Sequence, residues 1–217
     1  MKPILFNTSM VRAILDGEKT CTRRIIKLPK HIEKQSNGLY ILCAEGSTYS
    51  DKEFKDVVDY INPPYKVGDI LYVRETWFKG DLLNDAEEIE KQGIVLYRAD
   101  DIKNNNWDYD SIRWRPSIHM PKELARIFLK VTSVRAERLK DITDEGCYQE
   151  GISCTSFYDE AEHIQIAGIG LNDSLERATF GLLWNSTVKE DKYSWEGNPW
   201  VWVIEFEVEN KGGEINE

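Results

Sequence analysis

The chain has 217 residues, a formal net charge of -10 at pH 7, 41% hydrophobic residues and seven Trp. This composition supplies apolar area for the core of one large domain, and the acidic balance argues against a generic nucleic-acid coat, because phosphates are repelled at long range. No apolar run is long enough to span a bilayer, and the N-terminus lacks a signal peptide, so we expect a cytoplasmic protein with no membrane partner.

The first elements surround a turn. Residues 3–7 are predicted as a short apolar strand, and Thr8 or Ser9 can cap a following helix. Gly17 is predicted to end that helix, and a strand rich in β-branched residues begins near Thr22. A hairpin is expected over residues 38–50.

The middle of the chain is predicted to alternate strands with irregular segments. Strands are expected over residues 70–77 and 94–100, and residues 80–93 are acidic and polar, which favours a short helix or a loop. Residues 114–121 are predicted to be extended, because Pro116 and Pro121 exclude regular helix.

The C-terminal third begins with a long alternating strand over residues 123–139. Thr143 is predicted to cap a short helix through Glu150, and residues 153–173 are irregular. An amphipathic helix over 174–188 and a final strand over 198–209 complete the pattern. The helix is predicted to present one apolar face, formed by Leu175, Ala178, Leu182 and Leu183. Many strands and few long helices predict an α+β fold, a small β-barrel flanked by helices.

The sequence contains no Walker loop, Rossmann fingerprint or HExxH motif. The four cysteines form no C-x-x-C pair and no zinc spacing, and we interpret them as reduced thiols. The three His are scattered along the chain. The sequence therefore predicts no metal site and no cofactor.

The predicted turn carries an unusual charge. Residues 19–30 hold five basic residues and no acidic one, and residues 112–140 hold eight against two. If the two segments meet, they form one basic surface on an acidic body, which suits a focused anionic ligand. A solvated surface turn is the alternative interpretation.

Within this turn, Lys19, Thr22 and Arg24 follow Gly17 with the spacing G-x-K-x-x-T-x-R. A Thr hydroxyl becomes a nucleophile only if a base removes its proton, and Lys can do so where burial or nearby cations favour its neutral form. A carboxylate would orient the pair, although these residues alone do not select which one. Lys19 as a phosphate contact, with Thr22 an ordinary strand residue, is the alternative.

Four tryptophans, at positions 77, 114, 195 and 200, permit two interpretations. They can stack on a nucleobase, or they can fill the core. Trp114 and Trp195 flank loops rich in Pro or Gly, which favours the first interpretation for these two.

The spacing at Gly17, Lys19, Thr22 and Arg24 resembles the signature of the ASCH family, in which the Thr position is often Glu. Supporting blocks include VGDILYVRETW, the WRPSIHMP segment and NPWVWVIEF. The resemblance implies a single PUA-like domain over residues 1–209, with insertions near 31–60, 80–112 and 153–173 and a polar tail at 210–217. It is closest to phage- and prophage-type members.

The resemblance also implies a function. ASCH proteins are generally taken to bind RNA or modified nucleosides in a cleft beside the signature, and one small bacterial type hydrolyses N(4)-acetylcytidine with a triad of Lys, Thr and Glu. Carried over by position, the catalytic residues would be Lys19, Thr22 and Glu150. The ligand-binding residues would be Gly17, Arg23, Arg24, Arg74, Glu75 and Trp77.

Three hypotheses follow from these observations. The first is a basic cleft that binds RNA or a nucleoside. The second is a metal-independent amidohydrolase that deacylates an N-acylated cytidine. The third is a phage or prophage accessory protein that contacts another protein through its acidic surface.

Overall fold

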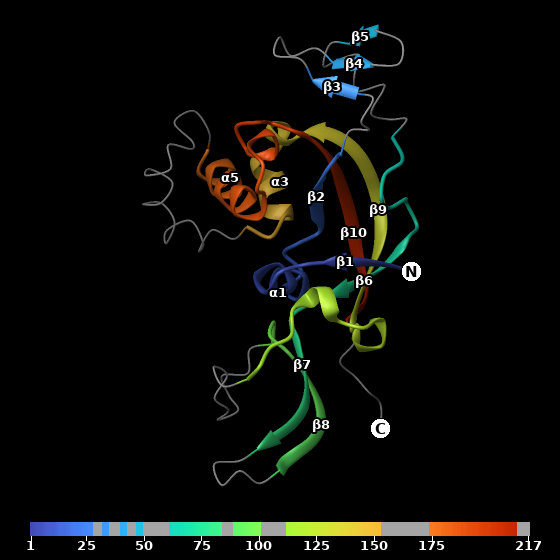
Figure 1. Cartoon of the computed structure of the whole chain (residues 1–217), viewed down its shortest axis with the longest axis vertical. Coiled ribbons are helices and arrows are strands. Elements are labelled where there is room, and N and C mark those ends of the chain that lie inside the picture. Colours follow the sequence, from blue (N-terminus) through green and yellow to red (C-terminus); the bar gives the residue numbers. More distant parts are fainter. Residues whose placement is uncertain are drawn as a thin grey trace. The chain divides into compact units, whose positions relative to one another are not determined.

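A computed structural model describes most of the chain as a mixed α+β protein (Figure 1). The described residues fall into two compact units: the first comprises Met1–Thr20, Gly68–Val131 and Phe206–Glu217, and the second comprises Cys21–Val67 and Thr132–Glu205. The structure describes residues 1–27, 32–34, 40–42, 47–49, 61–83, 89–100, 112–152 and 174–211. The insertion predicted near 153–173 lies outside these ranges.

The first unit contains three paired strands. Strand β1 (Lys2–Leu5) runs parallel to β6 (Ile70–Arg74), which pairs antiparallel with the first part of β9 (Ile127–Arg138). Alternate residues of β9, at 127, 129 and 131, are almost fully buried. This part of β9 therefore has the alternation that the sequence predicts for a strand with one face on a core.

Helix α1 (Thr8–Asp16) follows β1 and ends where the sequence predicts. Gly17 takes the left-handed conformation (φ 83°), which an L side chain rarely adopts. The cap at the other end differs from the prediction: Asn7, rather than Thr8 or Ser9, accepts the Met10 N–H through its side chain. Asn is an equally strong capping residue, and here it precedes both candidates.

A long hairpin corrects the prediction for residues 80–93. Strand β7 (Trp77–Leu83) pairs antiparallel with β8 (Ile89–Tyr97), so strand residues occupy most of the segment predicted as a helix or loop. The Gly93 N–H donates to the Asp81 carboxylate at 2.7 Å, and Gly93 has φ 66°. Local polarity indicated a loop, but cross-strand pairing stabilises the hairpin.

Two short 3-10 helices differ from the prediction: η1 (Ser117–His119) lies within the segment predicted to be extended, and η2 (Lys122–Leu124) overlaps the start of the strand predicted over 123–139. Pro116 and Pro121 stand at their N-caps, where the fixed φ of proline suits the start of a helical turn. Proline excludes a long helix here but not a single turn.

The second unit contains β2 (Cys21–Ile25), which pairs antiparallel with the first part of β10 (Trp200–Lys211). A separate small sheet contains β3 (Ile32–Lys34), β4 (Tyr40–Leu42) and β5 (Ser47–Tyr49). Strands β4 and β5 pair antiparallel, which confirms the hairpin predicted over 38–50. The described strands do not close into a barrel, and the PUA-like barrel stays a prediction.

Two helices of the second unit, α3 (Asp144–Gln149) and α5 (Leu175–Thr187), lie side by side (Figure 1). The Thr143 side chain accepts the Gly146 N–H at the start of α3, which confirms the predicted cap. Short 3-10 helices η3 (Leu139–Asp141) and η4 (Asp191–Tyr193) connect these elements to the strands. The core that they share contains Cys21, Leu139, Ile142, Cys147, Ile152, Ala178, Phe180, Trp184, Trp195, Val201 and Val203.

The buried face of α5 agrees with the predicted one only in part: Ala178 is buried, and Leu182 and Leu183 are half-buried against the core. Leu175 is 43% exposed, whereas Phe180 and Trp184 are buried. Trp195 packs directly on the helix at Gly181, where an added Cβ would lie 3.0 Å from the indole. Glycine at position 181 therefore leaves the space that the Trp195 ring occupies. Among the residues that the structure describes, no helix combines the length and apolar character needed to cross a membrane.

Candidate functional site

The residues of the signature are divided between the two units. Gly17 and Lys19 belong to the first unit, and Thr22, Arg23 and Arg24 belong to the second. Lys19 is only 1% exposed, and its Nζ lies 5.7 Å from the centroid of the Phe6 ring. Lys side chains are almost never fully buried, so the burial of Lys19 beside an aromatic ring makes it a candidate for a binding or catalytic role.

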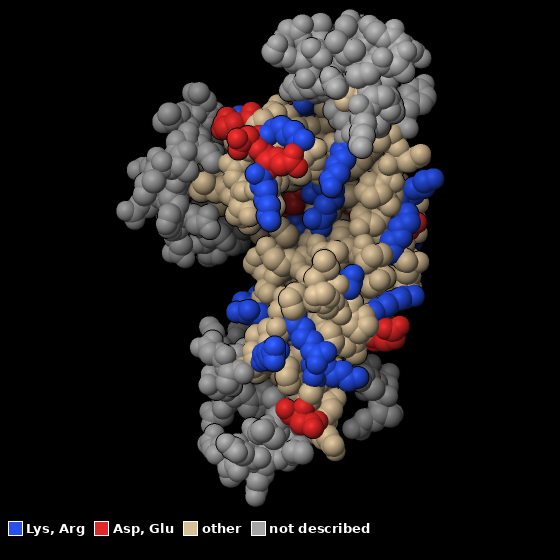
Figure 2. Space-filling view, viewed as in Figure 1, with Lys and Arg blue, Asp and Glu red and all other residues tan. Residues whose placement is uncertain are grey.

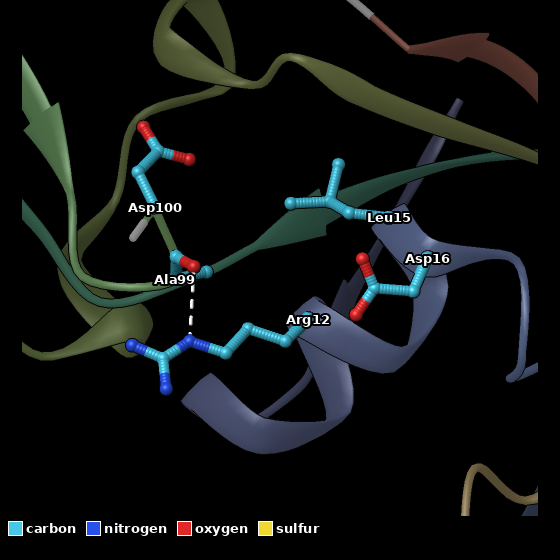
Figure 3. A pocket seen from close by; sticks show the side chains of 5 residues that line it. All are labelled: Arg12, Leu15, Asp16, Ala99 and Asp100. Atoms are coloured by element: carbon cyan, nitrogen blue, oxygen red, sulfur yellow. Dashed lines mark hydrogen bonds between the residues drawn. The ribbon is translucent and has the colours of Figure 1, made fainter. Parts of the chain in front are cut away.

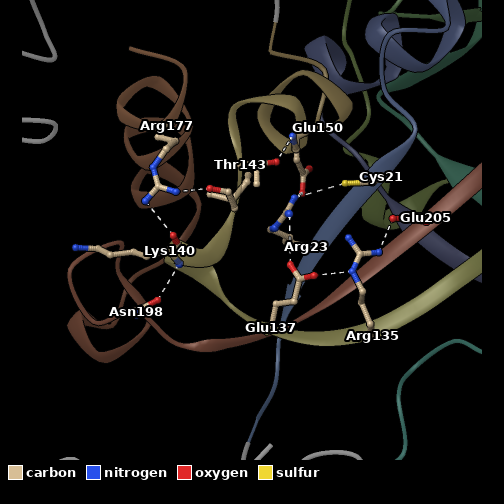
Figure 4. A network of polar contacts seen from close by, with 12 residues as sticks. Cys21, Arg23, Arg135, Glu137, Lys140, Thr143, Glu150, Arg177, Asn198 and Glu205 are labelled. Atoms are coloured by element: carbon tan, nitrogen blue, oxygen red, sulfur yellow. Dashed lines mark hydrogen bonds and ion pairs between the residues drawn. The ribbon is translucent and has the colours of Figure 1, made fainter. Parts of the chain in front are cut away.

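In the second unit, strand β2 carries Arg23 into a network of polar contacts (Figure 4). The Arg23 Nη1 lies 3.2 Å from Glu150 Oε1, and its Nη2 lies 3.8 Å from Glu137 Oε2. Nη1 also donates to the Cys21 sulfur at 3.5 Å. The Arg23 guanidinium is buried among these protein groups, so its role is to hold the Glu150 carboxylate in position.

Glu150 reaches β2 because of the short helix before it. It is the C-cap of α3 and is 5% exposed, like its partner Arg23. Gly146 faces the guanidinium: an added Cβ would lie 3.3 Å from Arg23 Nη2. The absence of a side chain at position 146 therefore lets Arg23 approach the helix and reach Glu150, which lies 127 positions away in sequence.

Arg24, the next residue of β2, is half-buried and interacts electrostatically with Glu150 and Tyr65 of the same unit. Burial lowers the pKa of Arg24, while the charges of Glu150 and Tyr65 act in the opposite direction. Burial raises the pKa of Tyr65, and Arg24 opposes that change. Arg24, Glu150 and Tyr65 thus combine hydrogen-bond donors, a carboxylate acceptor and an aromatic ring.

Tyr65 is absent from the predicted site. It follows Asn62, Pro63 and Pro64, which indicate an extended break between elements. An aromatic residue directly after such a break is the signal that could have identified it. Thr22 is 3% exposed on β2 and pairs in register with Ile204 of β10. The predicted convergence of Thr22 with Lys19 and Glu150 stays a prediction.

Arg74 and Trp77, two predicted ligand-binding residues, lie in the first unit. The Arg74 Nε donates to the Met120 carbonyl oxygen at 2.9 Å, and its Nη2 donates to the Ile118 carbonyl oxygen. Trp77 is 4% exposed, with the Arg115 guanidinium 5.0 Å from its ring centroid. Both side chains therefore contact the 112–120 segment of their own unit.

Glu75, the third predicted ligand-binding residue of the first unit, lies between Arg74 and Trp77 in sequence and is 1% exposed. The Nε and Nη2 of Arg126 donate to the two oxygens of the Glu75 carboxylate, at 2.9 and 3.0 Å. Burial raises the pKa of Glu75, and the hydrogen bonds and charge of Arg126 oppose that rise. A two-pronged contact of this kind fixes the orientation of both side chains.

A pocket of about 370 Å³ lies beside this cluster in the first unit (Figure 3). It is lined by Arg12, Leu15 and Asp16 of α1 and by Ala99 and Asp100, which follow β8. The Arg12 Nε donates to the Ala99 carbonyl oxygen at 3.0 Å. The pocket thus brings one guanidinium and two carboxylates to the same place.

The basic surface predicted from residues 19–30 and 112–140 involves residues of both units, and it stays a prediction. Figure 2 shows Lys and Arg side chains distributed over the face drawn, with fewer acidic ones. Within the described part of the chain, no group of three or more His, Cys, Asp or Glu is placed to hold a metal ion. Comparisons with protein-family models, curated proteins and solved structures give no match to this chain.

Proposed function

We propose that the chain is an ASCH-type protein with a PUA-like fold, and that it binds RNA or a modified nucleoside. The nucleobase is bound at the β2 segment of the second unit, by Arg24 and Tyr65 together with Glu150. Arg23 holds the carboxylate of Glu150 in place and does not contact the ligand.

One observation carries this proposal: the half-buried Arg24 lies within electrostatic reach of both Glu150 and Tyr65. A nucleobase offers hydrogen-bond donors and acceptors at its edge and a π-face for stacking. Guanidinium, carboxylate and phenol groups complement these three features. The signature spacing and the placement of Glu150 next to Arg23 agree with a site in this part of the unit.

A second candidate function is amide hydrolysis of an N-acylated cytidine. Its support is the burial of three polar residues that the sequence selected for chemistry: Lys19, Thr22 and Glu150 are 1%, 3% and 5% exposed. Burial of polar side chains costs free energy, so it is more common at functional positions. In this reaction Thr22 attacks the acyl carbon, Lys19 serves as base or oxyanion partner, and Glu150 relays the proton to the amine that leaves as the C–N bond breaks. Water then cleaves the ester formed on Thr22, which releases acetate and restores the hydroxyl.

Calorimetric titration with nucleosides tests the binding proposal. The panel contains cytidine, N(4)-acetylcytidine, uridine and adenosine, together with a short single-stranded RNA. Removing the ring in Tyr65→Leu deletes the stacking contact and should weaken binding by about 1–3 kcal/mol, which is roughly 5- to 150-fold. Arg24→Gln should also weaken binding.

Tyr193→Leu, which removes a half-buried Tyr elsewhere in the same unit, is the matched control and should bind as the wild type does. Equal affinity of wild type, Arg24→Gln and Tyr65→Leu for every ligand would remove the proposed site.

Release of acetate from N(4)-acetylcytidine tests the second candidate. Thr22→Val keeps the β-branched shape but removes the hydroxyl, so activity should fall by orders of magnitude. Thr179→Val makes the same change at a buried Thr of helix α5 and should stay active. Fully active Thr22→Val would rule out Thr22 as nucleophile, and an inactive wild type would rule out the reaction.

A further inference from the structure

Four exposed arginines belong to the first unit and come from three separate segments. Arg12 lies on α1, Arg98 follows β8, and Arg113 and Arg115 precede η1. We call these four residues the arginine surface. None of them belongs to the signature on which the proposed function rests.

Hydrogen bonds hold the three segments together. The Arg12 guanidinium donates to the carbonyl oxygens of Ala99 and Arg98, at 3.0 and 3.4 Å. The Arg98 N–H donates to the Thr76 carbonyl oxygen at 2.9 Å, and Arg115 exchanges two backbone bonds with Trp77, at 3.1 and 2.7 Å. Arg98 and Arg115 therefore lie on opposite sides of the Thr76–Trp77 backbone. Because neighbouring strands lie about 4.8 Å apart, the backbones of the two arginines are roughly 10 Å apart.

A fifth arginine, Arg126, forms ion pairs with the nearby carboxylates of Glu75 and Asp100. Arg126 binds Glu75 at both oxygens and lies 2.6 Å from the Asp100 carboxylate. Its guanidinium also stacks 3.9 Å from the centroid of the Tyr97 ring. Burial alone would lower the pKa of Arg126, but the hydrogen bonds and charges of Glu75 and Asp100 raise it overall. These two acids are thus neutralised by Arg126 rather than by the arginine surface.

The charges of the arginine surface are consequently available to a ligand. Within the described part of the chain, no carboxylate forms an ion pair with Arg12, Arg98, Arg113 or Arg115. Among the described residues, the hydrogen-bond acceptors of the Arg12 guanidinium are the carbonyl oxygens of Ala99 and Arg98, and the Arg115 guanidinium lies over the ring of Trp77. Several exposed cations close together on an acidic chain attract an anionic partner locally.

We propose that the arginine surface binds the phosphate backbone of single-stranded RNA. Its cations are all Arg, whose planar fork matches phosphate oxygens, and the half-buried Trp114 lies between Arg113 and Arg115 in sequence. Basic residues interleaved with an aromatic ring are typical of single-strand binding. The inference rests on the proposed function in requiring a nucleic-acid ligand, and it makes that ligand an oligonucleotide rather than a free nucleoside.

Asp16 allows a variant that should strengthen RNA binding, whereas the loss of an arginine should weaken it. It lies one turn after Arg12 on α1 and is exposed at the rim of the pocket in Figure 3. A carboxylate at this position repels a phosphate that approaches Arg12. Removing its charge should therefore strengthen RNA binding rather than weaken it.

The experiment measures fluorescence anisotropy of a labelled short oligouridine RNA between about 50 and 200 mM salt. For a single strand, each lost phosphate contact lowers the log–log salt slope by about 0.7, so Arg98→Gln/Arg115→Gln should lower it by about 1.4. Lys189→Gln/Lys192→Gln makes the same net charge change at exposed residues of the second unit and should leave the slope unchanged. Asp16→Asn should bind more tightly than wild type.

Each contrary outcome has a distinct meaning. An unchanged slope in Arg98→Gln/Arg115→Gln, or a wild type that binds no oligouridine, overturns the inference. Polyglutamate that binds as tightly, with the same dependence on Arg98 and Arg115, would identify an acidic polypeptide as the partner and also overturns it. If Arg24→Gln and Tyr65→Leu lose nucleosides while the arginine variant keeps its RNA slope, only the inference fails. The reverse pattern refutes the proposed base site alone.

Discussion

Each unit contains an arginine that bridges two carboxylates, but the two arginines are satisfied to different degrees. Arg126 of the first unit uses three nitrogens, two on Glu75 at 2.9 and 3.0 Å and one on Asp100 at 2.6 Å. Arg23 of the second unit is more buried, with 3% of its side chain exposed against 17% for Arg126. Its contacts with Glu150 and Glu137 are longer, at 3.2 and 3.8 Å.

The difference extends to the nitrogen nearest the backbone. The Arg23 Nε is buried without a hydrogen-bond partner among the described residues, whereas the Arg126 Nε bonds to Glu75. A buried arginine gains most when every N–H is paired, so the Arg126 cluster is the arrangement expected of a structural ion pair. Arg23 is paired less completely, so its contacts with Glu150 and Glu137 should contribute less to stability than those of Arg126.

The largest expected effect comes from breaking the Arg126 cluster. Arg126→Ala leaves the buried Glu75 without a partner, which should cost about 3–5 kcal/mol of unfolding free energy. Urea denaturation measures this loss. Lys130→Ala, at an exposed position of strand β9, which begins directly after Arg126, should change stability by less than about 0.5 kcal/mol. A loss below about 1 kcal/mol in Arg126→Ala would show that the cluster contributes little.

Breaking the Arg23 pair should have a smaller effect. Arg23→Ala should cost about 3 kcal/mol, the lower end of the range for buried pairs, because each contact is single and longer. The double variant Arg23→Ala/Glu150→Gln removes the unpaired charge as well, and it should recover part of that loss in urea denaturation. A cost in Arg23→Ala that exceeds the cost in Arg126→Ala would reverse the comparison.

The last effect appears only at alkaline pH and concerns Cys147, which lies in the core of the second unit near Arg23. Burial raises the pKa of the Cys147 thiol from 9.0 to about 12, with Arg23 opposing the rise. The folded state therefore keeps a proton that the unfolded state loses above its own pKa. This contribution to stability is fully present below pH 9 and is lost as the pH rises through about 12.

Urea denaturation across that pH window checks the expectation. The stability of the wild type should decline more steeply with rising pH than that of Cys147→Ala, because only the wild type carries the buried thiol. Identical slopes in the two proteins would mean that the thiol titrates normally in the folded state.

The comparison between prediction and structure separates two kinds of feature. Helix α1 with its end at Gly17, the cap at Thr143 and the β4–β5 hairpin were all predictable. Each depends on side chains within a few residues of one another, such as a left-handed Gly or a hydroxyl that accepts a nearby N–H. The strand predicted from residue 94 covers only the last part of β8, because the polar composition of residues 80–93 hides the cross-strand pairing that stabilises the rest of the hairpin.

The candidate site divides in the same way. The sequence by itself determined that Thr22, Arg23 and Arg24 lie on a strand directly after a helix, because capping and β-propensity act locally. Only the tertiary structure decided that Arg23 meets Glu150, that Tyr65 lies near Arg24, and that Trp195 packs on α5 at Gly181. Such contacts join residues far apart in the chain, and they form where packed elements bring side chains of complementary shape and charge together.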